Sequence, residues 1–186
     1  MKLKAIFILF IIPLFIISCK QKEGILEITV DYEQKAKWAS DQFAVWIEDN
    51  AGNYINTLFV TQFATTELAY TERGDCVPVW GSKAQPSKMT AEEIDAISMA
   101  TPPSGIYKHT WDLKDKQGIK IKPGTYVFVL EATLDNNSRV IFKNNIEIGR
   151  KPMSVSGIPE YTHPDREKNK DMIRSVVANY KLIDKL

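Results

Sequence analysis

The sequence has little of the residues from which the simplest metal, redox and nucleic-acid sites are built. Its 186 residues include two cysteines, two histidines, nine glycines and nine prolines. Two cysteines are too few for a disulfide framework or a four-cysteine zinc site, and so little glycine and proline excludes a collagen-like or low-complexity chain. The 24 basic and 23 acidic side chains leave no excess of positive charge with which to bind nucleic acid. The composition is that of an ordinary globular domain.

A long hydrophobic run is lacking as well. The longest is the 13-residue run from Ala5 to Ile17, which is short of the roughly 20 residues that a membrane-spanning helix needs. Lys2 and Lys4 precede it and Ser18 follows it. A basic start, a short apolar centre and a small residue are typical of a secretory signal peptide, here residues 1–18.

The end of this segment, Ile16-Ile17-Ser18-Cys19, resembles the lipobox of bacterial lipoproteins. In that family the cysteine thiol carries diacylglycerol, and the cysteine becomes the first residue of the mature chain. The resemblance implies a lipid on Cys19, a short lipidated tether over 19–24 and a membrane-bound domain over 25–186. An uncleaved anchor and a plain secretory signal are the alternatives.

Removal of the signal peptide changes the charge and the cysteine count. The remaining 168 residues carry 22 basic and 23 acidic side chains, a formal charge of −1. Cys76 is then the one free thiol, and no histidine lies near it in sequence to activate it. We expect a buried, inert thiol.

Alternation of apolar and polar residues predicts β-strands along most of the mature chain. The clearest case is Leu26 to Tyr32, where every second residue is apolar. Short polar turns rich in Asn, Asp and Gly separate the runs. Such spacing favours an antiparallel β-sandwich. The six expected strands cover residues 26–32, 43–47, 54–60, 107–111, 125–132 and 139–148.

Two stretches depart from this pattern. Residues 61–105 form a long insertion in which Thr90 and Glu93 have the spacing of a capping box, which predicts one short helix. Residues 150–170 are polar and contain three prolines, which indicates an irregular arm. The run from Met172 to Tyr180 fits either a helix or a strand by its spacing and its β-branched residues.

Two motifs connect the chain with known families. The pattern Gly105-x-Tyr107-x-x-x-Trp111-Asp112-Leu113, followed by Gly124-x-Tyr126-x-Phe128, resembles the Ig-like domain of flagellar hook-capping proteins. The wider chain, with Pro78-x-Trp80 and Leu130-Glu-Ala132, is similar to predicted periplasmic proteins with a domain of unknown function. The resemblance implies an Ig-like β-sandwich from about Leu26 to Tyr180, with a closing strand over Ile173 to Leu182. A flagellar role does not follow from a shared fold.

One segment of the insertion is similar to a cofactor attachment motif. Asp95-Ala-Ile-Ser98-Met-Ala-Thr101 resembles the Asp-x-x-Ser-Gly-Ala-Thr sequence at which a flavin transferase attaches FMN, through its phosphate, to a threonine hydroxyl. The resemblance implies a flavin on Thr101, with Ser98 and Ala100 shaping the loop, and a cofactor-binding set of Asp95, Ser98 and Thr101. The alternative is a helix end that Pro102 terminates.

The remaining candidates are aromatic residues. No spacing of His, Cys or Glu matches a metal site, and no motif of a hydrolase or a phosphate-binding loop is present. Among the four tryptophans we expect Trp46 and Trp111 in the core of the sandwich. Trp38 and Trp80 are the candidates for a recognition surface, with core packing as the alternative for Trp80.

These features predict a lipid-anchored envelope protein, held at the outer membrane and facing the periplasm. We expect it to be a non-enzymatic accessory protein without a resident cofactor, which presents its insertion to a partner protein and does not bind nucleic acid. The alternative is a flavin-linked redox accessory protein that carries FMN on Thr101.

Overall fold

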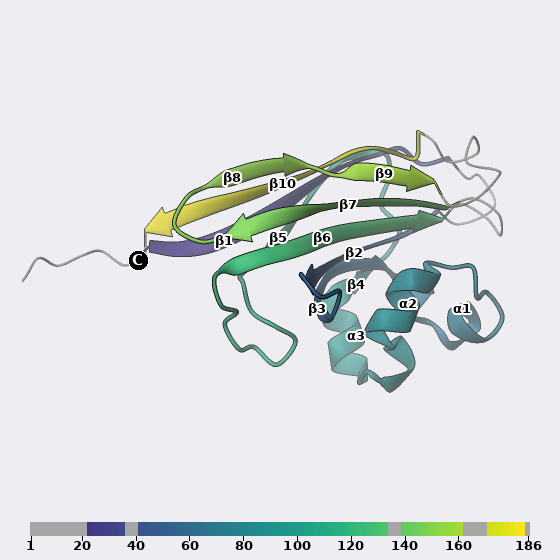
Figure 1. Cartoon of the computed structure of the whole chain (residues 1–186). Coiled ribbons are helices and arrows are strands. Elements are labelled where there is room, and N and C mark those ends of the chain that lie inside the picture. Colours follow the sequence, from purple (N-terminus) through teal and green to yellow (C-terminus); the bar gives the residue numbers. More distant parts are fainter. Residues whose placement is uncertain (1–21, 36–40, 134–138, 162–170, 185–186) are drawn as a thin grey trace, which may run out of the picture.

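The computed structural model describes residues 22–35, 41–133, 139–161 and 171–184. Within these ranges the chain forms ten strands, three short α-helices and two 3-10 helices (Figure 1). The strands are β1 (Lys22–Tyr32), β2 (Gln42–Asp49), β3 (Tyr54–Thr61), β4 (Ser98–Met99), β5 (Gly105–Trp111), β6 (Gly124–Thr133), β7 (Arg139–Ile148), β8 (Met153–Ser156), β9 (Ile158–Tyr161) and β10 (Ile173–Asp184). The helices are η1 (Gln62–Thr65), α1 (Glu67–Thr71), α2 (Pro78–Ala84), η2 (Pro86–Lys88) and α3 (Ala91–Ile97).

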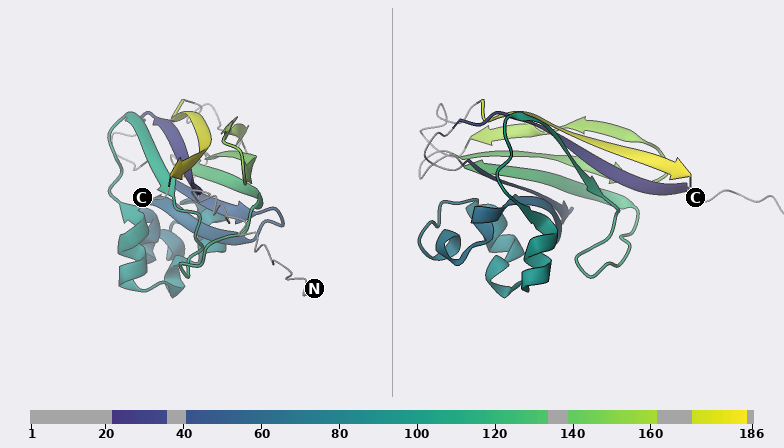
Figure 2. Two further views of the ribbon diagram at one scale, coloured as in Figure 1. Left: turned by 90° about the vertical axis from the view of Figure 1, so that its left-hand side faces the viewer. Right: turned by 180° about the vertical axis from the view of Figure 1, so that it is seen from behind.

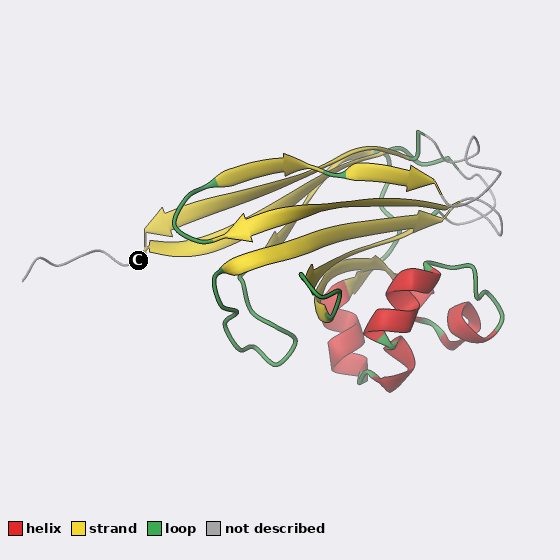
Figure 3. Ribbon diagram, viewed as in Figure 1, coloured by secondary structure: helices red, strands yellow, loops and turns green. Residues whose placement is uncertain are grey.

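The strands form two packed sheets, as the sequence predicts (Figure 3). A four-stranded sheet has the order β5-β1-β10-β8, and a six-stranded sheet has the order β4-β3-β2-β6-β7-β9. All of these pairs are antiparallel except β3 with β4, which is a parallel contact of two residues. The fold is therefore a β-sandwich with an antiparallel framework.

The sandwich core comes from the inward residues of both sheets. In β1, the side chains of Leu26, Ile28, Val30 and Tyr32 are fully buried, and the residues between them face the other side. Trp111 of β5 meets Tyr126 of β6 edge to face, with ring centroids 5.7 Å apart. The period of two therefore identified this core correctly.

The last strand, β10, closes the four-stranded sheet. It pairs with β1 along the whole of that strand, from Lys22 opposite Asp184 to Tyr32 opposite Ile173. This confirms the strand expected over Ile173 to Leu182. Local sequence could not decide between helix and strand because the deciding hydrogen bonds join residues about 150 positions apart.

Three expectations need correction. The proposed tether over 19–24 is shorter, because β1 already begins at Lys22. The arm over 150–170 is not irregular throughout, since it contributes β8 and β9 as edge strands, where Pro159 is tolerated. The insertion over 61–105 holds three α-helices and two 3-10 helices in place of one helix. These helices are too short to show a helical period in sequence, and packing supports them.

The insertion forms a third layer. Figures 1 and 2 show its helices against the face of the six-stranded sheet that points away from the four-stranded sheet. A second hydrophobic cluster fills this interface and joins Trp46 and Val60 of the sheet with Val77 and Trp80 of the insertion. Strand β2 is consequently buried on both faces. Trp46 therefore packs under the insertion and not between the sheets, whereas Trp111 lies in the sandwich core as expected.

None of the described helices has the length and apolar character that crossing a bilayer requires.

Candidate functional site

The residues of the flavin-like motif are spread along the end of the insertion. Asp95 is exposed on α3, Ser98 is half-buried in β4, and Thr101 follows in the loop before β5. Met99 and Ala100 beside them are exposed. The Thr101 hydroxyl donates to the backbone carbonyl of Asp41, at 3.3 Å. The three side chains lie along one segment, from α3 through β4 to the loop before β5.

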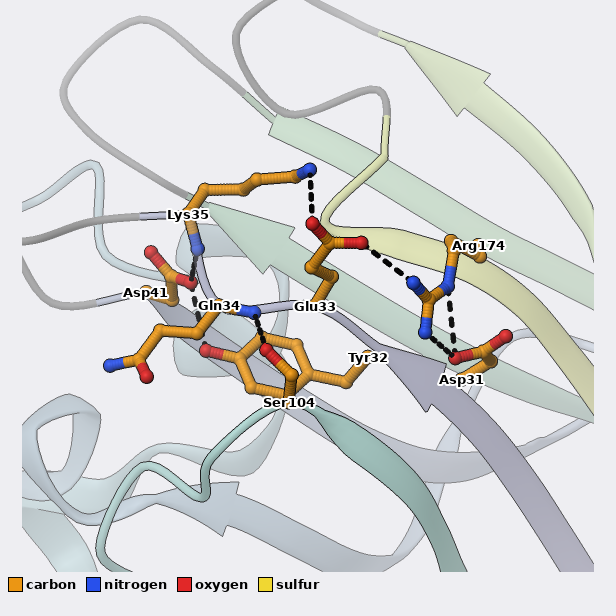
Figure 4. A network of polar contacts seen from close by, with 8 residues as sticks. All are labelled: Asp31, Tyr32, Glu33, Gln34, Lys35, Asp41, Ser104 and Arg174. Atoms are coloured by element: carbon orange, nitrogen blue, oxygen red, sulfur yellow. Dashed lines mark hydrogen bonds and ion pairs between the residues drawn. The ribbon is translucent and has the colours of Figure 1, made fainter.

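Asp41, to which Thr101 is bonded, is the centre of a buried polar cluster (Figure 4). Its side chain is 1% exposed. Its Oδ2 atom accepts from the Tyr32 hydroxyl at 2.8 Å and from the backbone amide of Lys35 at 2.7 Å. Burial, together with the neighbouring carboxylate, raises the pKa of Tyr32 far above its usual value. The cluster fixes the chain leaving β1 and gives Thr101 a rigid neighbour.

Beside this cluster lies an exposed group of ion pairs, also drawn in Figure 4. Arg174 of β10 contacts Asp31 and Glu33, and Lys35 contacts Glu33 at 3.1 Å. The lysine and the arginine lower the pKa of Glu33. Exposed pairs of this kind contribute little to stability, because water and salt screen the charges. They reinforce the β1–β10 pairing and offer no enclosed site.

Cys76 is packed in the cluster beneath the insertion. It is 8% exposed, and burial raises the pKa of its thiol to about 12. A thiol with so high a pKa has almost no thiolate at neutral pH and is a poor nucleophile. The structure therefore agrees with the expectation of an inert thiol.

We predict that Cys76 reacts with a thiol reagent only as fast as the protein unfolds. In a Cys19→Ser chain, where Cys76 is the remaining thiol, native protein at pH 8 is expected to be unmodified while urea-unfolded protein reacts fully. The measurement is the absorbance of the released thiol chromophore. Immediate reaction of native protein would contradict the packing described above.

A buried carboxylate anchors α2 to the sheet. Glu131 of β6 is fully buried and accepts from the backbone amides of Val79 at 3.2 Å and Trp80 at 2.9 Å, in the first turn of α2. Arg139 of β7 lies 3.8 Å from the same carboxylate. Burial is the largest influence and raises the pKa of Glu131 to about 7, against the opposing effects of the amides and the arginine. The group is a structural anchor.

The indole of Trp80 provides a second anchor. Its Nε1–H donates to Thr57 Oγ1 at 2.9 Å, and Thr57 also shares a 2.7 Å hydrogen bond with the Tyr54 hydroxyl. Trp80 is fully buried, so it is a core residue and not part of a recognition surface. Trp38, the other candidate for such a surface, lies outside the described residues, as do Cys19 and His163.

His109 lies at the edge of the sandwich core. Its ring is 4.6 Å from that of Phe59, and its Nε2 atom is buried without a hydrogen-bond partner among the described residues. Burial lowers its pKa to about 4. The folded protein therefore holds a neutral imidazole.

We predict that His109 makes the protein sensitive to acid. Because the folded pKa is below the unfolded value of 6.5, the unfolded chain binds the extra proton, and stability is lost as the pH falls from 6.5 towards 4. At pH 5 this loss is about 2 kcal/mol. The variant His109→Phe keeps a ring against Phe59 and removes the titration. Urea denaturation at pH 7 and pH 5 is the measurement, and an equal loss of stability in both proteins would contradict the prediction.

The described residues form a groove of about 810 Å³ between the insertion and the β5–β6 loop. Its floor contains Asn56, Thr57 and Leu58 of β3. One wall includes Met89 and Ile97 of the insertion, and residues 114–118 of the loop form the opposite wall. The groove therefore brings together three segments that are far apart in sequence.

The groove is lined by charged groups of both signs. Asp112 is paired with Lys114 at 2.6 Å, and Asp115 Oδ1 accepts the backbone amides of Gln117 and Ile119. The ammonium group of Lys116 lies 6.0 Å from the centre of the Tyr54 ring. The carboxylates are thus engaged with the loop itself, which leaves ammonium groups on the groove surface.

Sequence reasoning missed both Glu131 and the groove. A signal for Glu131 was present, since it is a single acidic residue in the otherwise apolar run Val127 to Ala132. The groove had no such signal, because no single segment contains it. Among the described residues, His, Cys, Asp and Glu side chains do not gather in groups of three or more suited to a metal ion.

The comparison with protein families identifies the family of the chain. Residues 25–162, which are 138 of the 186, match a family described as predicted periplasmic protein (DUF2271). The chain belongs to this family. The DUF2271 match covers β1 to β9 and includes the insertion and both walls of the groove. No curated protein and no solved structure matches the chain.

Proposed function

We propose that this DUF2271 protein is a lipid-anchored, non-enzymatic accessory protein of the cell envelope that binds a partner protein in the groove between the insertion and the β5–β6 loop. The observation that carries the proposal is the groove itself, which has a volume of about 810 Å³ and is built on a rigid sheet. Sites that lie between layers of a fold are preferred places for binding.

The rigidity of the insertion supports this function. Glu131 and Trp80 fasten α2 to the sheet, and the ion pair of Lys83 with Glu48, at 2.8 Å, joins its last turn to β2. At the other wall, Trp111 Nε1–H donates to the carbonyl of Lys114 at 2.6 Å. A groove with two fixed walls loses little conformational entropy on binding.

Photocrosslinking in the native cell tests the groove. A photoreactive residue in place of Lys88 or Lys116, on either side of the groove, is expected to give the same discrete adduct. The control position is Lys181, which is exposed on the outer face of the four-stranded sheet. Adducts that are absent from the groove positions, or that are identical at Lys181, would refute the proposed function.

The lipid anchor at Cys19 is the second part of the proposal. The lipobox-like sequence Ile16 to Cys19 and the periplasmic family description support it. Diacylglycerol supplies two acyl chains, which is what stable anchoring needs. We expect radiolabelled palmitate to be incorporated into the protein and lost in Cys19→Ser, with the label in the outer-membrane fraction. A Ser18→Ala control is expected to keep the label, and incorporation that persists in Cys19→Ser would refute the anchor.

A second candidate function is flavin-linked redox chemistry with FMN on Thr101. The exposure of Met99 and Ala100 next to Thr101 favours it, because a transferase needs access to the loop. Attachment would break the hydrogen bond from Thr101 to the Asp41 carbonyl. Coexpression with a flavin transferase tests this function. In-gel flavin fluorescence and an FMN mass on the Thr101 peptide, both lost in Thr101→Ala, would support it, and a colourless protein would refute it.

A further inference from the structure

Strand β3 is an open edge over most of its length. It pairs with β2 on one side, whereas on the other side β4 pairs only with Val60 and Thr61. Residues from Tyr54 to Phe59 therefore have no strand on that side within the described part of the chain. Their outward backbone groups form a template to which another strand can pair.

This edge already accepts a hydrogen bond from a neighbouring segment. The backbone amide of Lys116, in the β5–β6 loop, donates to the carbonyl of Ile55 at 3.2 Å. The bond lies at one end of the open stretch, and β4 lies at the other. Between them no strand pairs with Asn56 to Phe59 on this side within the described residues, over a length of about 13 Å at the rise of an extended strand. Thr57 and Phe59 are buried in this stretch, and Asn56 and Leu58 are partly exposed.

The free stretch coincides with the floor of the groove. Asn56, Thr57 and Leu58 belong both to the open edge and to the groove lining. The groove is thus a site where an extended segment can add to the sheet between α3 and the β5–β6 loop. Main-chain hydrogen bonds give such binding its affinity, and the walls select the side chains.

Two of the other edge strands contain residues that discourage pairing. Edge strand β9 contains Pro159 and edge strand β5 contains Lys108, which are residues that discourage pairing. The sequence of the open stretch, Tyr54-Ile-Asn-Thr-Leu-Phe59, has neither a proline nor a charge. Two register shifts of β3 against β2 bend this edge, but its residues have no charge with which to repel an incoming strand.

The charges on the groove indicate which segment fits. Lys88 donates to the amide oxygen of Gln85, and Lys116 lies over Tyr54, so neither ammonium group has a carboxylate partner among the described residues. The lining also carries three carboxylates, which are engaged locally. Asp112 pairs with Lys114, Asp115 accepts the amides of Gln117 and Ile119, and Glu93 accepts the amide of Thr90. The two lysines complement acidic side chains on an incoming segment.

We propose that the groove binds an extended acidic segment of a partner protein, which adds to the six-stranded sheet as a further strand on the open edge of β3. Its aspartate or glutamate side chains pair with Lys88 and Lys116. This inference rests on the proposed function of the groove as a partner site, and it specifies the binding mode and the chemistry of the partner.

The first test selects the segment. A display library of random eight-residue peptides is selected against the full chain. The selected peptides are expected to be rich in β-branched residues and in Asp or Glu, without a central proline. Synthetic copies are expected to bind at least about tenfold more weakly to Lys88→Glu and Lys116→Glu, which corresponds to about 1.4 kcal/mol. The matched control Lys181→Glu, on the opposite sheet, is expected to bind as the unaltered chain does.

The second test detects the added strand directly. In an extended peptide, alternate amides face the edge of the sheet and the others face away. N-methylation of one alternate set is expected to abolish binding, and N-methylation of the other set is expected to leave it intact. Equal effects of the two sets, selection of basic or helical peptides, or no selected peptide would overturn the inference. If the crosslinks of the proposed function persist in any of these cases, the groove remains a partner site and only the strand addition is wrong.

Discussion

Replacing Trp80 by alanine is expected to lower the free energy of unfolding by about 4 kcal/mol. The side chain is fully buried between α2 and the six-stranded sheet, where it packs with Val60 and Val77 in the cluster beneath the insertion. The substitution removes this contact area, leaves a cavity and removes the hydrogen bond to Thr57. The insertion is held on the sheet largely by this cluster, so its docking weakens most.

The measurement is urea denaturation followed by circular dichroism. Trp80→Phe is the matched control, because it keeps an aromatic ring and loses the Nε1–H donor with the smaller part of the indole, while Thr57 stays bonded to Tyr54. Its expected cost is about 1–2 kcal/mol. If Trp80→Ala also lowers the dependence of stability on urea, then the insertion detaches before the sandwich unfolds. A cost below about 1 kcal/mol would contradict the buried position of the indole.

The second large effect is a dependence of stability on pH that comes from Glu131. Burial raises the pKa of its carboxyl from 4.5 to about 7 in the folded protein. Between these values the folded chain holds a proton that the unfolded chain releases, so stability falls as the pH rises from 4.5 to 7. The total is on the order of 3 kcal/mol, at about 1.4 kcal/mol for each pKa unit.

The variant Glu131→Gln isolates this contribution. Glutamine keeps an oxygen that can accept from the amides of Val79 and Trp80, and it carries no charge at any pH. As the pH rises from 4.5 to 8, the unaltered protein is expected to lose stability relative to the variant. Arg139 and the thiol of Cys76 are the other ionisable groups near this carboxylate and are the same in both proteins. A difference that does not change with pH would contradict the prediction.

The sandwich could be predicted because the burial of residues along a strand such as β1 follows an alternation that is visible within that strand's own sequence. In β1, alternate residues face the core and solvent, so the period of two is visible in the sequence. The capping box of α3 is local too, and both of its hydrogen bonds, between Thr90 and Glu93, are present. Features that depend on residues within one turn or one strand were therefore found.

The third layer could not be predicted, because its signals are long-range. Strand β2 is buried on both faces, which removes the alternation that would mark the covered face. Helix α2 has seven residues, and Val77 directly before it adopts a left-handed conformation with φ of 40°. Its position depends on Glu131, 51 residues away from Trp80. Propensity within the insertion contains none of this information.

The two candidate sites show the same contrast between a local and a long-range signal. The flavin-like motif was visible because it occupies seven consecutive residues, although its threonine is bonded to Asp41, 60 residues away. The groove was invisible because β3, α3 and the β5–β6 loop meet only in the folded chain. Pairing Asn56 with Lys114 by a hydrogen bond, for example, depends on the whole sandwich topology.

The early start of β1 would set the distance of the domain from a membrane to which the proposed lipid binds it. With Cys19 acylated as proposed, only Lys20 and Gln21 separate the lipid from Lys22, a reach of about 10 Å at full extension. Lys120 of the β5–β6 loop lies 3.9 Å from Glu23, so one wall of the groove stands beside this attachment point. With this proposed anchor the domain would stand on the membrane without a stalk. It would sample partners by lateral diffusion in a layer close to the lipid headgroups, and a partner segment held far above that layer would stay out of its reach.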